Sequence, residues 1–351
     1  AAIQNGVFNG GAGIDTVDLG SYTTPLSIQL TGLGTTDGLR VRAAGPLGTA
    51  SDSIDAVIGG SAADQITGLN GVASWSIGMT DSYTTSSHTV TIQGVELRIG
   101  GNGADTFSVQ AGVLPAIANR LRGGSGNDTF NVNVAAGASL ASGATLAIDG
   151  SDLTANAANR DTVNLNANAV GDGARTIGLT FQSATTGDLD ISGFGATSIN
   201  LTEIESLNVN GDSANNDTVT VTGTGNSDNL TVTPAANGAS VFLGGATDFV
   251  SPGVAGGGDG PDIVVSGVSQ TGLTIDGAAG SADQLLYNGA GALTLTSSSS
   301  GTFSKAGVAD VNFVNIETQA AALGIAYTLD AQGDAGDGVA DNFLVEINTG
   351  F

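Results

Sequence analysis

The residues best placed to do chemistry in this chain are aspartates that close a repeated glycine-rich phrase. The phrase Gly-Gly-x-Gly-x-Asp-Thr-Phe-x-Val occurs at Gly100–Val109 and again at Gly123–Val132. Each copy delivers an aspartate, Asp105 or Asp128, directly before a short alternating segment. Glycine and aspartate are turn formers, and a turn aspartate can cap backbone amides. Ordinary turn chemistry is therefore one prediction for these aspartates.

The segment after each aspartate has the pattern of a half-buried strand. Phe107 and Val109 share one face, because side chains two apart on a strand point the same way. A unit with one apolar face is stabilised by stacking on copies of itself. Looser copies of the phrase supply further candidate aspartates, namely Asp15, Asp64, Asp161, Asp217 and Asp228.

A second phrase, an apolar segment with an acidic residue, precedes some glycine turns. It occurs at Gln93–Ile99, Glu203–Val209 and Val314–Glu317. Strand, Gly/Asp turn, strand and variable loop together predict an all-β solenoid of the parallel β-helix or β-roll kind. Coils of about 20–25 residues would give about 15 rungs and a rod of about 70 Å. Tandem β-sandwich modules are the alternative, since the gaps between copies leave room for antiparallel hairpins.

The solenoid is predicted to span residues 1–318, and residues 319–351 to form an acidic loop and a terminal strand that could serve assembly. The stretches Val72–Thr91 and Phe242–Gly260 are expected to be loops or extra strands. Val113–Leu121 is the one segment that suggests a turn of helix, and Pro115 limits it.

The charge balance restricts the possible partners. The 351-residue chain carries 33 acidic and 8 basic residues, a net charge of -25. Such a surface repels phosphate backbones and attracts cations. We therefore expect that the protein does not bind nucleic acids. The chain has no cysteine. It also has no apolar run long enough for a membrane helix. We expect a protein that does not span a membrane.

The glycine phrase resembles the nonapeptide repeats of RTX (hemolysin-type) calcium-binding proteins. The resemblance covers Gly10–Asp18, Gly100–Ser108 and Gly123–Asn131. It implies that turn carboxylates and carbonyls bind Ca²⁺, which prefers oxygen ligands. RTX repeats follow one another directly, whereas these copies stand apart, as in degenerate versions from large bacterial surface-layer and matrix proteins. The implied ligands are Asp15, Asn102, Asp105, Asn127 and Asp128, with Asp161, Asp217 and Asp228 from the looser copies.

A second acidic loop lies near the end of the chain, at Asp330–Asp341. Its aspartate spacing partly matches an EF-hand loop, although Ala335 stands where glycine is expected. Calcium binding by Asp334, Asp337 and Asp341 and a plain acidic turn are both open.

Catalysis is not expected. His88 is the single histidine and lies in a Ser/Thr-rich segment without the context of a catalytic triad. The cluster Arg98, Arg120 and Arg122 is interpreted as neutralising nearby aspartates. Trp75 and Tyr83 could stack on sugar rings, but covering a loop is the favoured interpretation.

These patterns predict a non-enzymatic, calcium-stabilised structural protein, secreted or on a bacterial cell surface. It would be a surface-layer, adhesin or fibre subunit that assembles into an oligomer or polymer, with a cell-surface polysaccharide as a further partner. A parallel β-helix enzyme acting on polysaccharides, or a carbohydrate-binding module, is the alternative.

Overall fold

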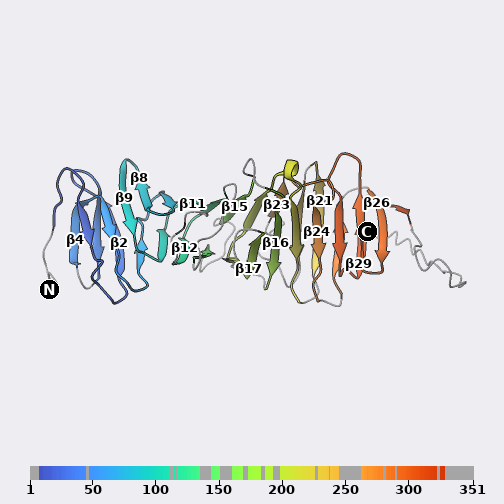
Figure 1. Cartoon of the computed structure of the whole chain (residues 1–351), viewed down its shortest axis with the longest axis horizontal. Helices are drawn as coiled ribbons and strands as arrows, with labels where there is room; N and C mark the ends of the chain where they lie inside the picture. The colour runs from blue at the N-terminus through green and yellow to red at the C-terminus, as the bar shows by residue number, and fades with distance from the viewer. Residues whose placement is uncertain are drawn as a thin grey trace, which may run out of the picture.

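The computed structural model is an elongated all-β rod in which short strands lie across the long axis (Figure 1). Two mostly parallel sheets, of 14 and 16 strands, run along the rod. This confirms the predicted parallel solenoid-like architecture, because the sheets are continuous and do not divide into separate sandwiches. The structure describes residues 8–44, 47–110, 114, 117–134, 144–150, 160–168, 173–182, 186–192, 198–225, 228–236, 238–244, 262–266, 268–279, 282–288, 291–321 and 325–328.

Among its described strands, the 14-stranded sheet is parallel in its middle and at both ends, with one antiparallel section on each side of the middle. In spatial order it consists of β1 (Thr16–Asp18), β5 (Ala56–Ile58), β9 (His88–Gln93), β8 (Asp81–Thr85), β7 (Ser74–Ile77), β11 (Thr106–Gln110), β13 (Thr129–Asn133), β15 (Thr162–Asn166), β19 (Ser206–Asn210), β23 (Asp262–Ser266), β22 (Gly238–Gly244), β21 (Asn229–Ala235), β25 (Gln284–Tyr287) and β29 (Thr318–Ala321).

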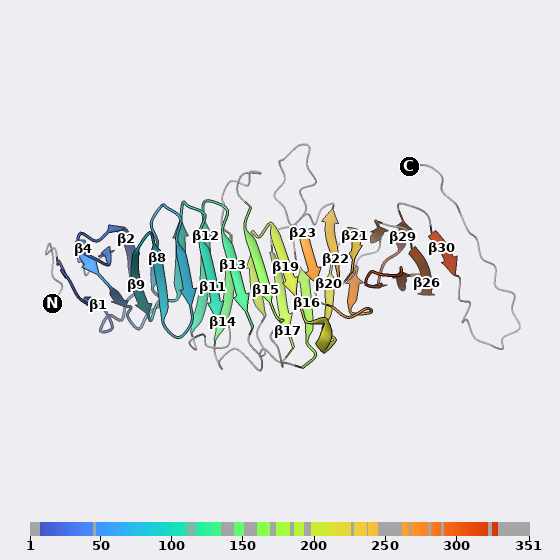
Figure 2. The same cartoon turned by 90° about the horizontal axis from the view of Figure 1, so that it is seen from above.

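The 16-stranded sheet lies beside it along the whole rod (Figure 2). In the same direction it consists of β4 (Leu47–Ile54), β3 (Leu39–Ala43), β2 (Ser27–Leu33), β6 (Gln65–Thr67), β10 (Leu97–Gly101), β12 (Ala118–Gly124), β14 (Thr145–Asp149), β18 (Ile199–Thr202), β17 (Thr186–Ile191), β16 (Thr176–Phe181), β20 (Thr218–Thr222), β24 (Leu273–Asp276), β28 (Val311–Val314), β27 (Ser300–Ser304), β26 (Gly291–Ser297) and β30 (Ile325–Thr328).

In the middle of the rod the chain alternates between the sheets, one strand in each. From β10 to β15 each coil stacks on the one before, with parallel pairing in both sheets. The two copies of the glycine phrase lie in register here, because Phe107 pairs with Phe130 and Val109 with Val132. Like residues therefore stack on like residues, which is the physical meaning of the sequence repeat.

Among the strands that the structure describes, five antiparallel three-stranded meanders interrupt this simple pattern. They are β2–β4, β7–β9, β16–β18, β21–β23 and β26–β28. The first and third strands of a meander each pair in parallel with a simple coil where both neighbours are described, as β7 does with β11 and β9 with β5. The predicted variable stretch Val72–Thr91 is thus largely strand, and the predicted antiparallel hairpins occur inside the solenoid.

The interior between the sheets is filled by one continuous row of apolar side chains. Its largest members stack as a ladder: the ring centroids of Trp75 and Phe107 are 5.6 Å apart, and those of Phe107 and Phe130 are 4.8 Å apart. Tyr287 and Phe303 stack in the same way near the other end, at 4.7 Å. Stacked aromatic pairs of this kind add about 0.5–1.5 kcal/mol beyond the burial of their area.

The structure corrects one smaller expectation. The segment Val113–Leu121 was the best helix candidate, but from Ala118 it forms strand β12. Within the described residues the regular helical structure is the short 3₁₀ helix η2 (Ser213–Asn215). None of the described helical structure is long and apolar enough to cross a membrane.

Candidate functional site

The predicted aspartates lie at the corners where the chain passes from one sheet to the other. Asp105 and Asp128 sit between β10 and β11 and between β12 and β13. The first glycine of each phrase faces the carboxylate of its own turn. A Cβ on Gly100 would overlap the Asp105 carboxylate and the Gly123 carbonyl oxygen, and a Cβ on Gly123 would overlap the Asp128 carboxylate. The spacing of glycine and aspartate is therefore a packing requirement of the corner.

The carboxylates of successive corners form a ladder along the inside edge of the rod. The backbone N–H of Asp105 donates to Asp128 Oδ1 at 2.7 Å, and that of Asp128 donates to Asp161 Oδ1 at 2.7 Å. At one end of the ladder, the N–H of Ala73 donates to Asp105 Oδ1 at 2.8 Å. At the other end, the N–H of Asp161 donates to Glu205 Oε2 at 2.6 Å. We call Asp105, Asp128, Asp161 and Glu205 the carboxylate ladder.

Other corners repeat the same device outside the ladder. A buried carboxylate oxygen accepts a backbone N–H from a neighbouring coil at 2.7–2.8 Å. The pairs are Leu26 N–H to Asp64, Arg175 N–H to Asp217 and Asp228 N–H to Asp283. Because backbone donors in a buried corner need a partner, these carboxylates satisfy groups that the parallel sheets leave unpaired.

The ladder places like charges next to one another in a water-poor corner. All four of its members are buried. Burial, followed by the charge of Asp128, raises the pKa of Asp105 to about 7, although the bond from the Ala73 N–H lowers it. Asp105 Oδ2 is also buried, without a hydrogen-bond partner among the described residues. A carboxyl in this position is partly protonated near neutral pH.

The second sequence phrase closes the meanders. At the end of β4 and directly after β9, β18 and β28, a residue with left-handed φ is followed by a buried apolar residue and then by an acid. These triplets are Ser53-Ile54-Asp55, Gly94-Val95-Glu96, Glu203-Ile204-Glu205 and Asn315-Ile316-Glu317, with φ of 55°, 66°, 51° and 54° at their first residues.

The acid of each triplet accepts a hydrogen bond from the backbone N–H of the corner aspartate in the preceding coil. The N–H of Asp64 donates to Glu96 Oε2 at 2.7 Å, and the N–H of Asp283 donates to Glu317 Oε2 at 2.8 Å. In return, the carbonyl of Asp64 accepts the N–H groups of Glu96 and Leu97 at 3.1 and 3.0 Å. The acid of the second phrase is therefore a structural partner of the aspartate of the first, a link that the sequence pattern alone did not reveal.

The residues predicted to bind calcium do not converge on one point. Asp105, Asp128 and Asp161 lie in the ladder, whereas Asn102 and Asn127 are exposed, and Asn127 Oδ1 accepts the N–H of Arg160 at 3.0 Å. In the described part of the chain, no group of three or more His, Asp or Glu residues is arranged to hold a metal ion. In these corners one oxygen of each ladder aspartate accepts a backbone N–H.

The remaining predicted ligands are dispersed or outside the described residues. Asp217 and Asp228 occupy separate buried corners, and the N–H of Asp15 donates to Asp55 Oδ2 at 3.0 Å. Asp334, Asp337 and Asp341, together with the predicted terminal strand, lie outside the described residues.

Three of the arginine and aromatic candidates, Arg98, Trp75 and Tyr83, are buried in the interior of the rod. Arg98 is buried inside the rod, where it forms an ion pair with Asp81, its Nε lying 2.7 Å from Asp81 Oδ2. Arg98 also donates to Asn119 Oδ1 at 3.2 Å. The side chains of Trp75 and Tyr83 point into the core and are buried. Neither is therefore available to stack on a sugar ring, and neither covers a loop. Burial raises the pKa of Asp81, while the charge of Arg98 lowers it.

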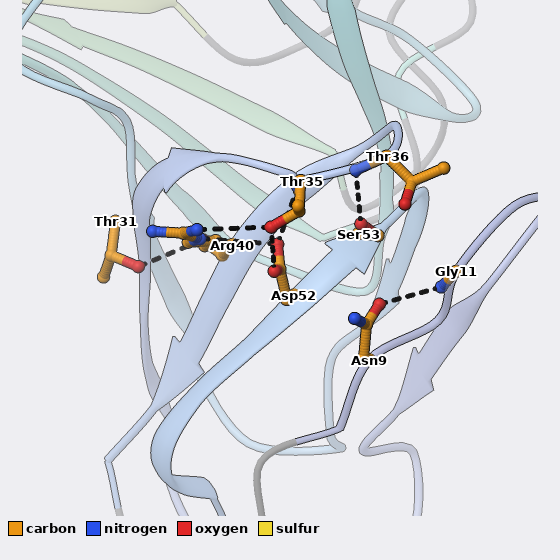
Figure 3. A network of polar contacts seen from close by, with 8 residues as sticks. All are labelled: Asn9, Gly11, Thr31, Thr35, Thr36, Arg40, Asp52 and Ser53. Atoms are coloured by element: carbon orange, nitrogen blue, oxygen red, sulfur yellow. Dashed lines mark hydrogen bonds and ion pairs between the residues drawn. The ribbon is translucent and has the colours of Figure 1, made fainter.

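A polar network at the N-terminal end fastens the first meander (Figure 3). Asp52 accepts hydrogen bonds from the N–H and the hydroxyl of Thr35 and pairs with Arg40 Nε at 3.4 Å. The N–H of Thr36 donates to Ser53 Oγ at 3.1 Å. The hydroxyl of Thr35 holds the pKa of Asp52 below its usual value. The network joins β4 to the β2–β3 hairpin and leaves Asp52 without the raised pKa of a general base.

The outer face of the 14-stranded sheet carries a feature that sequence reasoning missed. From β9 to β19 its outward side chains form two aligned columns of hydroxyls and amides. One column is Thr89, Thr84, Ser74, Thr106, Thr129, Thr162 and Ser206, and the other is Thr91, Ser82, Ser76, Ser108, Asn131, Asn164 and Asn208. We call these two columns the polar face. The signal in the sequence was the run of Thr and Asn at alternate positions of these strands.

Asparagines on this face bond to one another from coil to coil. Asn164 Nδ2 donates to Asn131 Oδ1 at 2.8 Å, and Asn208 Nδ2 donates to Asn164 Oδ1 at 2.7 Å. A second row, outside the two columns, links Asn210, Asn166 and Asn133 at 3.0 Å. We call these rows the asparagine ladders. Such ladders stabilise stacked, nearly untwisted parallel strands.

Comparison with models of known protein families finds no match to this chain, and comparison with curated proteins also finds none.

Proposed function

We propose that this chain is a rigid, non-enzymatic rod in an extracellular structural or adhesive protein of a bacterial surface. The observation that carries the proposal is the continuous stack of two sheets whose corner carboxylates are used as acceptors for backbone N–H groups. Each coil is bonded to the next through the strands, the corners and the asparagine ladders. Such a structure resists bending and holds its two ends at a fixed separation.

The same use of the carboxylates argues against the enzyme alternative. General acids and bases need a carboxyl that can reach a substrate. In the ladder, Asp105, Asp128 and Asp161 are buried and turned towards backbone donors of the preceding coil. A glycosidase needs two opposed carboxyls across an open groove, and the described corners do not supply that arrangement.

Calcium binding stays a prediction of the repeat resemblance. The acidity of the chain supports it, since a net charge of -25 attracts divalent cations. In the described corners one oxygen of each carboxylate accepts a backbone N–H, and no group of three or more His, Asp or Glu residues there is arranged to hold a metal ion. The prediction therefore depends on the loop with Asp334, Asp337 and Asp341 or on contacts between subunits.

Small-angle X-ray scattering together with electron microscopy tests the rod. We expect an elongated particle about 70 Å long, since the sheets stack strands at about 4.8 Å. End-to-end filaments at high concentration would support self-assembly of a fibre or lattice. A compact particle would contradict the rod. Release of reducing sugars from a polysaccharide by the pure protein would overturn the non-enzymatic assignment.

A further inference from the structure

The polar face differs in charge from the rest of the molecule. The chain has a net charge of -25, yet the two columns from Thr89 to Ser206 and from Thr91 to Asn208 contain only Ser, Thr and Asn. All of these side chains are exposed or half-exposed. At comparable positions the outer face of the 16-stranded sheet carries Arg120, Arg122, Asp149, Asp188 and Asp190. The charge is thus kept off one face.

The side chains of the polar face are also held in fixed positions. In the asparagine ladder the central amide, Asn164, donates one N–H to Asn131 and accepts one N–H from Asn208. An amide has two N–H donors and two acceptor lone pairs, so each keeps a donor and an acceptor directed away from the ladder. Thr84 and Thr89 are joined through their hydroxyls at 2.9 Å. Fixed side chains lose little entropy when they bind a ligand.

Electrostatics selects the kind of partner. A polyanion would be repelled by the net charge of -25, and so would a second copy of this chain. A polycation would be attracted to the acidic regions in preference to an uncharged face. An uncharged partner is the one that can bind to this face without desolvating charged side chains.

The geometry selects a linear partner. The columns run parallel to the rod axis, as the side-by-side strands β11, β13, β15 and β19 in Figure 2 show. Six strand spacings of about 4.8 Å give a strip about 29 Å long. We propose that the polar face binds a neutral, linear polysaccharide that lies along the rod, its hydroxyls exchanging hydrogen bonds with successive coils. This inference rests on the proposed function, and it names the partner that the rod would bind.

The mode of binding follows from what the face lacks. The aromatic residues of these strands, Trp75, Tyr83, Phe107 and Phe130, all point inward. Ring stacking on sugars therefore does not contribute, and the affinity comes from many weak hydrogen bonds in a row. Such binding increases with the length of the polymer until the strip is covered.

A matched pair of double variants tests the proposal. T129E/T162E places two glutamates on neighbouring parallel strands of the polar face, and T220E/T274E does the same on the outer face of the other sheet. All four threonines are half-exposed. The probes are cellulose and chitin particles in sedimentation assays, and dextran, amylose, mannan and the polyanion alginate in affinity electrophoresis.

We expect at least one neutral polymer to bind, with T129E/T162E weakening the affinity about tenfold or more, since a charge against a neutral ligand is left unpaired. T220E/T274E should bind as the parent does, and alginate should not bind. Failure of all five neutral polymers, or equal loss in both variants, would overturn the inference. A dimer abolished by T129E/T162E, without polymer binding, would overturn it in favour of a second copy.

Circular dichroism and scattering separate this inference from the proposed function. A parent protein that remains an elongated β rod but binds no neutral polymer overturns only the polysaccharide assignment. A parent protein that is not a rod overturns the proposed function itself.

Discussion

Two rows of hydrogen bonds run along the same coils of this molecule. The carboxylate ladder lies inside a corner, and the asparagine ladder lies on the outer face. The carboxylate ladder joins Asp105, Asp128 and Asp161 through backbone N–H groups, and the asparagine ladder joins Asn131, Asn164 and Asn208 through their side chains. Their bond lengths are nearly the same. The first is buried and the second is half-exposed.

Burial decides what each ladder contributes. A buried N–H that loses its acceptor costs about 1–3 kcal/mol, whereas water replaces a lost partner at an exposed site. The carboxylate ladder should therefore determine stability, and the asparagine ladder should mainly fix the positions of surface side chains. Four predictions test this difference.

The largest effect is expected from Asp128→Ala. The variant removes the acceptor of the Asp105 N–H in a buried corner, so the free energy of unfolding should fall by about 2–3 kcal/mol. Urea denaturation followed by circular dichroism measures this. Asp149→Ala is the control, because its ion pair with Arg122 is partly exposed and should contribute less than about 1 kcal/mol. Equal effects from the two variants would contradict a special role for the corner.

The second prediction concerns pH. The pKa of Asp105 is about 7 in the folded protein, above the ordinary value of 3.8, so the folded state binds this proton more tightly than the unfolded state. This group therefore stabilises the fold as the pH falls from about 7 towards about 4, and the gain is lost as the pH rises through about 7.

Asp105→Asn removes this titration. The difference in unfolding free energy between the variant and the parent should change between pH 7.5 and pH 5, with the parent gaining on the variant as the pH falls. Thr106→Val, which changes the neighbouring half-exposed residue and no titratable group, should give a difference that is nearly constant over the same range. A constant difference for Asp105→Asn as well would show that its carboxyl is not perturbed.

A smaller effect is expected from Asn164→Ala. This change removes bonds of 2.8 and 2.7 Å from the asparagine ladder, but water can reach the groups left behind. We expect a loss of about 0.5–1 kcal/mol in urea denaturation. A loss as large as that of Asp128→Ala would mean that the outer ladder carries the stability of the rod.

The smallest effect is expected from chelation. If the corner carboxylates serve the backbone, excess EGTA should leave the melting temperature of the rod unchanged within about 1 °C, which is less than the shift of about 1.4 °C that a 1 kcal/mol change produces in a 351-residue chain. A large downward shift with EGTA, reversed by Ca²⁺, would instead support the calcium prediction for the Gly/Asp corners.

Much of the fold could be predicted from the sequence because repeats and period-two alternation are local signals. Phe107 and Val109, repeated as Phe130 and Val132, indicated inward faces that stack in register. The meanders were less visible, since β7–β9 lack the glycine phrase and their pairing depends on partners distant in the chain. Trp75 and Tyr83 looked like loop residues for the same reason, although both are in the core.

By itself the sequence determined that this protein is a stack of strand–turn units, since glycine, aspartate and alternating apolar residues each act over a few neighbouring positions. Only the tertiary structure decided what the aspartates do. An aspartate after a glycine turn can cap an amide or bind a cation. The choice depends on which atoms the preceding coil brings to its oxygens, and here the preceding coil brings a backbone N–H.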